Sequence, residues 1–337
     1  MAPRLKVLTG HRINKAVNHR RSEYIMYIEQ PFQTTLKRVV MLEDIGLHSG
    51  RYVRASICPA PADTGIQFHR VDVEERRQTV VACADNAEQA RLCTRIVNAD
   101  GVGMETVEHF MAAFAGVGLD NAIVEIDAGE APILDGSSKP IVDALNNAGL
   151  ELLASRRRQL IVTQPIEVRM DCGAWARLEP ADRLEIEVEI DFDDSAIGRQ
   201  SYHYTHLDGS FESELASART FCQMRDVKLM QSAGLALGGS LNNAIVVEDG
   251  AVLNEGGLRM DDEFVRHKVL DCLGDLYLLG MQVKGKMVAS RPGHALSTKL
   301  IQKLWQDVQS YRIVEDGSPL GGADGYAMPE LAAAAAV

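Results

Sequence analysis

The sequence holds 337 residues with a formal net charge of -12; 46% of the residues are hydrophobic and 24% are charged. These values are typical of a soluble globular protein, and the length accommodates one large domain or two moderate ones. The acidic balance argues against a nucleic-acid binder, which needs a basic surface. The longest apolar runs fall well short of a bilayer span, so we expect no transmembrane helix.

Positive charge gathers at the start of the chain. Residues 1–38 include eight Lys or Arg and only two Glu. We expect residues 1–30 to form a basic, disordered extension. An Arg-bearing, acid-free start also resembles an organellar transit peptide, but a disordered tail or a true start at Met26 is the favoured interpretation. Without the apolar core of a secretory signal, export is not indicated.

The cysteines point to a reducing compartment. There are six, with no C-x-x-C pair and no spacing typical of disulfides. In a chain of this length, that pattern indicates packed free thiols in the cytoplasm. None of them is a candidate nucleophile.

The first half of the chain mixes strands with two helices. We expect strands over 52–57 and 121–126, and helices over 106–115 and 140–148, the second with Pro140 in its first turn and Gly149 behind it. Residues 151–158, which end in three arginines, are expected to be a linker.

The second half opens with a strand. From Leu184 to Asp193 apolar and acidic residues alternate strictly, which predicts one buried face and one solvated face. A helical segment near 214–218, a Gly-rich stretch around 234–240 and a long helix over 262–279 follow. The Ala-rich tail at 331–337 has no predicted role. The overall pattern is α+β in two domains rather than alternating βαβ.

The helix over 262–279 carries a row of polar residues with chemical potential. His267, Asp271 and Asp275 stand at i, i+4 and i+8, beside an apolar stripe and at the expected edge of the buried region. A His and a carboxylate one turn apart can hold one metal ion, and Asp275 could orient a further group. The alternative is a solvated His–Asp pair on the helix surface.

Two other places could complete such a site. Glu108 and His109 are adjacent at a helix start, where His109 could bind a metal and Glu108 could act as a general base. His294 follows Pro-Gly in an expected loop, as a positioned acid would. Each has a plain alternative: an acid favoured by the helix dipole, a packed His, or a surface His. The spacing His203-x-x-His206 is disfavoured as a metal pair, because it lies in an expected polar loop without a third ligand.

Several runs together resemble one family, the UDP-3-O-acyl-N-acetylglucosamine deacetylases of lipid A synthesis. They occur in the family's order between about residues 35 and 309, so together they are far more specific than any single motif. The runs are GLHSG (46–50), TVEH (106–109), PILDGS (132–137), ARTF (218–221), LGGS (237–240), DEFVRHKVLD (262–271) and GHAL (293–296).

The resemblance implies a fold and a domain organisation. The fold has two topologically similar domains, each a helix pair packed on β-sheets, with the helices sandwiched between the domains. Domain I would span 31–150 and domain II 159–316, with a linker at 151–158 and a tail at 317–337. An insert at about 222–253 would form a passage for the acyl chain of the substrate.

The resemblance also implies roles for individual residues. One zinc ion would be held by His109, His267 and Asp271, with Fe²⁺ as an alternative at such a site. Glu108 would act as general base, and His294, held by Asp275, as general acid. Thr220 would stabilise the oxyanion. The substrate-binding residues would be Phe221, Asp226, Lys268, Arg291 and His48.

We therefore expect a monomeric cytoplasmic hydrolase that removes the N-acetyl group from UDP-3-O-(3-hydroxyacyl)-N-acetylglucosamine. Its partner is this acylated UDP-sugar, with at most transient contact with the inner membrane and no nucleic acid. The alternatives are a zinc amidase acting on a different acylated sugar, and a pseudoenzyme that binds the substrate without cleaving it. A second, dehydratase activity is not expected, since little chain follows Asp316.

Overall fold

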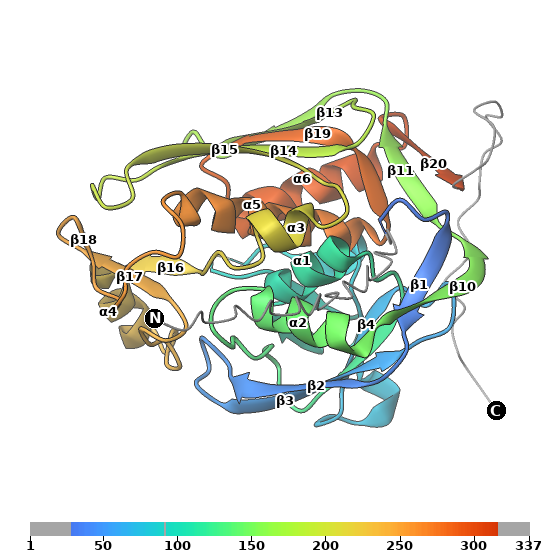
Figure 1. The fold of residues 1–337 in the computed structure, drawn as a ribbon, viewed down its shortest axis with the longest axis horizontal. Helices are drawn as coiled ribbons and strands as arrows, with labels where there is room; N and C mark the ends of the chain where they lie inside the picture. The colour runs from blue at the N-terminus through green and yellow to red at the C-terminus, as the bar shows by residue number, and fades with distance from the viewer. Residues whose placement is uncertain (1–27, 91, 316–337) are drawn as a thin grey trace, which may run out of the picture.

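The computed structural model describes residues 28–90 and 92–315, and the expectations for residues 1–27 and for the tail lie outside these ranges. Figure 1 shows the main helices between two sheets, one built from the first half of the chain and one from the second. This is the α+β sandwich that was expected. Among the described residues, no helix is both long enough and apolar enough to cross a membrane.

The first sheet is mostly antiparallel, with the strand order β2-β3-β9-β4-β5. Only the pair β4 and β9 is parallel. Side chains of β3 alternate between the core and solvent, as the period of two predicts. The strands are β2 (Val40–Ile45), β3 (Tyr52–Pro59), β4 (Ile66–Arg70), β5 (Thr79–Val81) and β9 (Ala122–Ile126).

The second sheet repeats this arrangement. Its five strands β12-β13-β19-β14-β15 correspond in order to β2-β3-β9-β4-β5, and among these five only β14 and β19 are parallel. Two more strands, β11 and β20, extend it beside β19. The expected topological similarity is therefore confirmed. The strands are β11 (Arg158–Val162), β12 (Ile166–Arg169), β13 (Trp175–Glu179), β14 (Leu184–Asp191), β15 (Arg199–Thr205), β19 (Gln282–Ser290) and β20 (Tyr311–Glu315).

The helices follow the same repeat. In each half, one helix precedes the central strand and one follows it: α1 (Glu108–Val117) and α2 (Lys139–Ala148) flank β9, while α5 (Glu263–Leu276) and α6 (His294–Gln306) flank β19. Two further α-helices are α3 (Ser210–Glu214) and α4 (Met224–Ser232), and short 3-10 helices span η1 (Glu75–Arg77), η2 (Ala84–Asn86) and η3 (Tyr277–Leu279). The remaining strands of the described residues form one pair, β1 (Phe32–Leu36) with β10 (Leu150–Arg156), and two small sheets: β6 (Ala87–Glu88), β7 (Arg95–Val97) and β8 (Gly103–Glu105), and β16 (Phe221–Gln223), β17 (Ile245–Glu248) and β18 (Ala251–Val252).

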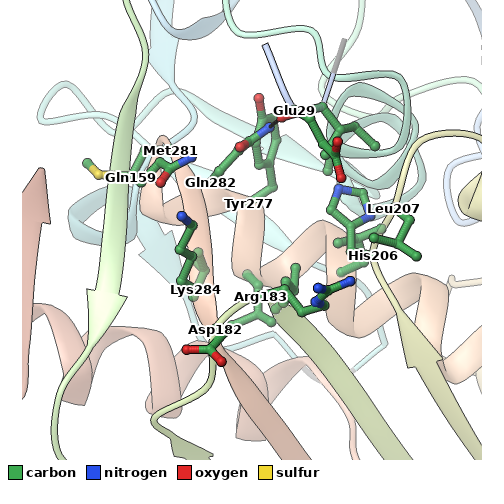
Figure 2. A pocket seen from close by; sticks show the side chains of 16 residues that line it. Glu29, Gln159, Asp182, Arg183, His206, Leu207, Tyr277, Met281, Gln282 and Lys284 are labelled. Carbon is green, nitrogen blue, oxygen red and sulfur yellow. Dashed lines mark hydrogen bonds between the residues drawn. The ribbon is translucent and has the colours of Figure 1, made fainter. Parts of the chain in front are cut away.

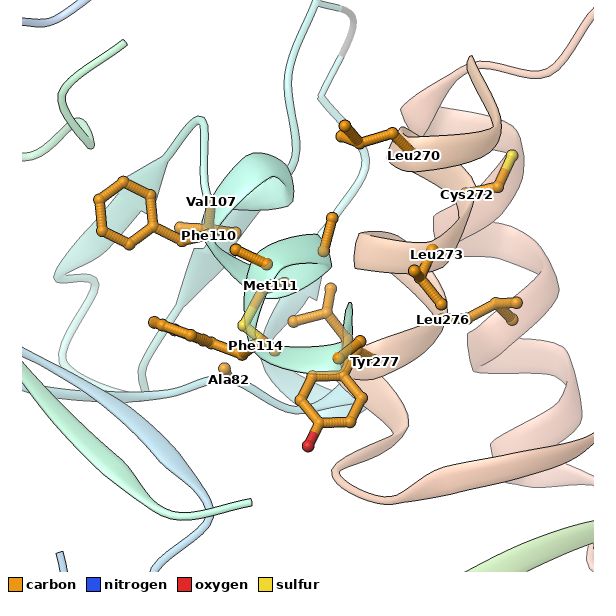
Figure 3. Packing of buried hydrophobic residues seen from close by; sticks show 14 of the residues in the cluster. Ala82, Val107, Phe110, Met111, Phe114, Leu270, Cys272, Leu273, Leu276 and Tyr277 are labelled. Atoms are coloured by element: carbon orange, nitrogen blue, oxygen red, sulfur yellow. The ribbon is translucent and has the colours of Figure 1, made fainter. Parts of the chain in front are cut away.

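The centre of the molecule is the contact between α1 and α5. Apolar residues of both helices meet there, among them Met111 and Leu273 (Figure 3). The backbones approach closely because α5 has Gly274 at the crossing: a Cβ on this residue would lie 2.2 Å from the carbonyl oxygen of Glu108. The apolar stripe expected on α5 is buried, but the polar row of His267, Asp271 and Asp275 does not lie at the edge of the buried region, because the sandwich buries nearly the whole helix.

Two expected segments differ from the structure. The segment expected to link the domains is structured, because residues 150–156 form β10, antiparallel to β1. The helical segment expected near 214–218 lies earlier, at α3. There the ring of buried Phe211 packs directly on Gly116 of α1, where any Cβ would be 2.1 Å from the ring, so the helical turn forms around this anchor.

Arg157 joins the start of the described chain to the centre of the fold. The side chain is 1% exposed, and its five N–H groups donate to Asp120 and to the carbonyl oxygens of Ile28, Gln30 and Gly118. Ile28 is also buried, so the extension expected over 1–30 ends before this residue. Residues 28–30 belong to the folded part.

Arg157→Ala should destabilise the protein by about 3–5 kcal/mol, because the Asp120 carboxylate, which is only 12% exposed, would lose its ion-pair partner. The neighbouring Arg158 is the matched control: its side chain is 41% exposed and 3.9 Å from Asp63, so Arg158→Ala should cost no more than about 1 kcal/mol. Urea unfolding of both variants measures the difference. Equal losses would contradict the role assigned to Arg157.

Candidate active site

Six ionisable side chains from three helices meet where α1 crosses α5. Glu108 and His109 are the first two residues of α1, and His294 is the first residue of α6. The expected loop position of His294 was wrong, because α6 begins at this residue. The remaining three come from successive turns of α5, and each of the six is less than a tenth exposed: Glu108, His109, His267, Asp271, Asp275 and His294.

Three of these side chains form a candidate metal site. The ligand atoms of His109, His267 and Asp271 all lie within 4.8 Å of one another. Oδ1 of Asp271 is 3.3 Å from Nε2 of His267 and 3.8 Å from Nε2 of His109. The other oxygen, Oδ2, accepts a hydrogen bond of 2.6 Å from Nζ of Lys268. One carboxylate oxygen is therefore held and the other faces both imidazoles.

The protonation of these groups fits a divalent cation. Nδ1 of His267 donates to the carbonyl oxygen of Ala218 at 3.0 Å, so Nε2 of the neutral ring carries a lone pair. Burial lowers the pKa of His267 and lowers that of His109 to about 3, which keeps both rings neutral. Among the described residues, Oδ1 of Asp271 is buried without a hydrogen-bond partner. Lone pairs that face one another in a buried site repel, and a cation bound between them removes this repulsion.

Glu108 lies beside this cluster with one free oxygen. Its Oε2 accepts a hydrogen bond of 3.0 Å from the backbone N–H of Thr94, while Oε1 is 3.6 Å from Nε2 of His294. Burial raises the pKa of Glu108 to about 7. A carboxylate with this pKa exchanges protons readily near neutral pH, as a general base must.

His294 lies near Glu108, and its ring is held at Nδ1 by two other residues. Its Nδ1 lies 2.9 Å from Oγ1 of Thr94 and 3.3 Å from Oδ2 of Asp275. Burial alone would lower the pKa of His294, but the carboxylates of Glu108 and Asp275 outweigh it and raise the pKa to about 9. The ring is therefore cationic at neutral pH and can donate a proton.

The loop around His48 lies near the site, because, besides burial, the charge of His294 helps to lower the pKa of His48. Among the described residues, both ring nitrogens of His48 are buried without a partner, and burial lowers its pKa. Its backbone N–H and that of Ser49 donate to the carboxylate of Glu130, at 2.7 and 2.8 Å. Thr106 also donates to this carboxylate and has a φ of 56°, which is strained for a β-branched residue.

The structure brings the predicted oxyanion residue, Thr220, and two of the predicted substrate residues, Phe221 and Lys268, to the site. Thr220 lies between Ala218, which accepts the hydrogen bond from His267, and Phe221, whose ring centre is 6.3 Å from that of His267. Lys268 contacts Asp271, as described above, so its expected contact with a diphosphate remains a prediction.

Two predicted substrate residues are exposed to solvent. Arg291 is exposed in the turn before α6, with a φ of 53°, and its Nη2 donates to the carbonyl oxygen of Cys172 at 3.1 Å. Asp226 is exposed in the first turn of α4. Their roles in binding the diphosphate and the sugar or nucleotide remain predictions.

Sequence reasoning missed Thr94, Ala218 and Glu130 as parts of the site. Thr94 and Glu130 belong to no periodic pattern, and Ala218 acts through its carbonyl oxygen, which any residue could supply. Only the fold places them here.

The spacing of His203 and His206 does not create a metal pair. The expected loop was wrong, because His203 lies in β15 and pairs with Glu185 at 2.9 Å. His206 follows the strand, bonds the hydroxyl of Tyr204 at 2.9 Å and lines a cavity of about 300 Å³ (Figure 2). None of the six clustered side chains lines this cavity.

The site has two neutral imidazoles and one carboxylate whose ligand atoms converge, with a general acid and a general base beside them. Metal-dependent hydrolases have this arrangement. Comparison with known proteins indicates which family of these hydrolases the chain resembles. The profile of the family described as "LpxC: UDP-3-O-acyl N-acetylglycosamine deacetylase" matches residues 33–306. The chain belongs to this family.

Curated relatives agree with the profile. A protein of Anaeromyxobacter sp. (strain Fw109-5) is 45% identical over 282 residues, covering 84% of this chain and 91% of the relative. Proteins of Pseudoalteromonas atlantica and Shewanella halifaxensis are 43% and 40% identical, each over 285 residues, covering 84% of this chain and 93% and 92% of the relatives. All three are named UDP-3-O-acyl-N-acetylglucosamine deacetylase.

His267→Ala should abolish stoichiometric metal binding, because two of three ligands cannot hold a divalent ion in a catalytic geometry. His203→Ala is the matched control, since this histidine pairs with Glu185 on the surface and should leave the metal content unchanged. Elemental analysis of both purified variants gives the metal per chain. Full occupancy in His267→Ala would show that the ligand set is wrong.

Proposed function

We propose that this chain hydrolyses the N-acetyl group of UDP-3-O-(3-hydroxyacyl)-N-acetylglucosamine to the free amine and acetate, a committed step of lipid A biosynthesis. The observation that carries the proposal is the convergence of three ligand residues, His109, His267 and Asp271, with Glu108 and His294 beside them. Membership of the family supplies the substrate class.

The three ligand residues would hold one Zn²⁺ ion, since imidazole and carboxylate suit zinc, and Fe²⁺ is an alternative at the same donors. When bound, such an ion polarises the amide carbonyl and lowers the pKa of a water molecule. Lys268 orients the carboxylate of Asp271. Its hydrogen bond to Oδ2 leaves Oδ1 as the single oxygen that faces both rings.

Glu108 takes the proton of the attacking water. Its Oε2 is occupied by the N–H of Thr94, so Oε1 is the oxygen available to receive the proton. The carboxylate precedes a ligand residue and is not itself part of the ligand set. This division between ligand and base is the one used by other metal-dependent hydrolases.

His294 delivers a proton to the departing nitrogen. An amine leaves poorly until it is protonated, so the reaction needs a separate acid. Asp275 lies at Nδ1, on the far side of the ring, and therefore holds the imidazole while Nε2 points toward Glu108 and Asp271. The hydroxyl of Thr220 would stabilise the negative oxygen that forms on the carbonyl; one such donor contributes about 3 kcal/mol.

The insert at 222–253 supports an acylated substrate. Helix α4 has no buried residue, and Leu229 and Leu237 are 64% and 56% exposed. The insert docks on the 46–50 loop, where Leu237 N–H donates to the carbonyl oxygen of His48 at 3.1 Å. A Cβ on Gly238 would lie 2.3 Å from the carbonyl oxygen of Gly46, so the fit requires glycine. Exposed apolar groups beside the site suit an acyl chain.

Other residues around the site suit the rest of the substrate. The ring of Phe221, close to His267, would stack on the sugar. Lys268 and the exposed Arg291 would contact the diphosphate, and Asp226 the sugar or nucleotide. The ring of His48, which has no hydrogen-bond partner within residues 28–90 and 92–315, would contact a polar substrate group.

The same proposal covers the organisation and location of the chain. The two repeated sheets draw their strands from residues 40–126 and 166–290, which supports domain I at 31–150 and domain II at 159–316. All six cysteines are free thiols, which supports the cytoplasm. We propose a monomer that contacts the inner membrane only transiently, when it takes up its acylated substrate.

Acetate release should be fast with the acylated UDP-sugar and negligible with simple N-acetylhexosamines, because distant parts of the substrate supply the binding energy that orients the amide. A coupled acetate assay on both substrates measures the ratio. Comparable kcat/KM values would favour an amidase for a different sugar. Binding of the UDP-sugar without any acetate release would favour a pseudoenzyme.

Glu108→Gln should retain the metal and lower kcat by roughly 10²- to 10⁴-fold, because the amide cannot accept the proton. Glu105→Gln is the matched control: this residue lies three positions away, pairs with Arg95 and faces outward with a side chain 41% exposed. The Glu105→Gln variant should hydrolyse the substrate at the wild-type rate. If Glu108→Gln also did so, Glu108 would not be the base.

A further inference from the structure

Thr94 contacts three groups of the site: the proposed base, the proposed acid and the carboxylate of Asp275. It is 1% exposed and lies just before β7. Its backbone N–H donates to Oε2 of Glu108 at 3.0 Å. Its hydroxyl contacts both Asp275 and Nδ1 of His294, the latter at 2.9 Å. The base, the acid and the carboxylate behind the acid therefore all meet at one residue.

The hydroxyl has only one proton, and this decides the direction of each bond. A carboxylate cannot donate, so the Thr94 hydroxyl gives its proton to Oδ1 of Asp275. Its lone pairs then face His294 and can only accept the Nδ1 proton. The first ring proton is thereby fixed on Nδ1, and the transferable proton is on Nε2, 3.6 Å from Oε1 of Glu108.

The contact from Thr94 is also the shorter one to the ring. Its Oγ1 lies 2.9 Å from Nδ1, whereas Oδ2 of Asp275 lies 3.3 Å away. Asp275 therefore does not position the imidazole alone. The position of Thr94 is itself set by the start of α1, because its carbonyl oxygen accepts the N–H of Val107 at 3.4 Å.

We propose that Thr94 is a positioning residue for this reaction: its hydroxyl fixes the tautomer and the orientation of His294, and its backbone N–H fixes Glu108 with Oε1 free. The inference rests on the proposed deacetylation. Thr94 acts through the acid and the base, so its side chain should affect kcat rather than substrate affinity.

Thr94→Val tests the hydroxyl, because valine keeps the shape and the backbone N–H. We expect kcat to fall roughly 10- to 100-fold, with KM changed by no more than about twofold and the metal content unchanged. Thr94→Ser retains the hydroxyl and should restore kcat to within about threefold of wild type. Thr94→Ala, a second variant without the hydroxyl, should match Thr94→Val.

Thr35→Val is the matched control. The hydroxyl of Thr35 is buried in β1 and makes two hydrogen bonds, to the carbonyl oxygen of Asn121 at 2.9 Å and from the N–H of Ala60 at 2.8 Å. This variant should lose stability without losing kcat. A loss of kcat shared by Thr35→Val and Thr94→Val would overturn the proposal, as would a wild-type kcat in Thr94→Val.

A double-mutant cycle with His294→Ala separates positioning from general damage. If the hydroxyl acts through His294, Thr94→Val should reduce kcat far less in the His294→Ala background. An equal reduction in both backgrounds would overturn the proposal. Failure of the wild-type chain to release acetate would instead refute the proposed function, so the two results are distinguishable.

Discussion

The close approach of α1 and α5 is the constraint on which the site depends. Each helix belongs to one of two repeats with the same strand order, and neither carries a complete set of ligands. Because Gly274 has no side chain, the backbone of α5 meets that of α1 at Glu108, and His109 then reaches the side chains of His267 and Asp271. A larger residue at the crossing would separate the helices and with them the ligands.

Burial gives these side chains their chemical character. Away from water, His109 and His267 stay neutral, while Glu108 becomes a weaker acid and His294, surrounded by carboxylates, holds its proton. The lone pairs that converge on Oδ1 of Asp271 are unfavourable without a cation, so metal binding and the stability of the α1–α5 contact should be coupled. The polar groups around the cluster hold each ring and carboxylate in one orientation.

The sequence predicted the parts of this account that follow a pattern. Helical spacing placed His267 and Asp271 on one side of a helix, and the ordered motifs indicated the family and the sandwich fold. Other features follow no pattern. Nothing in the run of three arginines distinguishes Arg157, yet its side chain is buried because every N–H of its guanidinium has an acceptor. Thr94 is a single hydroxyl whose partners lie up to 200 residues away, and the positive φ of Thr106 is imposed by the fold.

We propose that two imidazoles and one carboxylate, drawn from both halves of the chain, bind a single divalent ion. X-ray absorption at the K edge of the metal in the purified protein tests it most directly. We expect one ion per chain, with only nitrogen and oxygen neighbours, at about 2.0–2.2 Å if the ion is zinc. A sulfur neighbour at about 2.3 Å, or a protein that deacetylates its substrate without any bound metal, would contradict it.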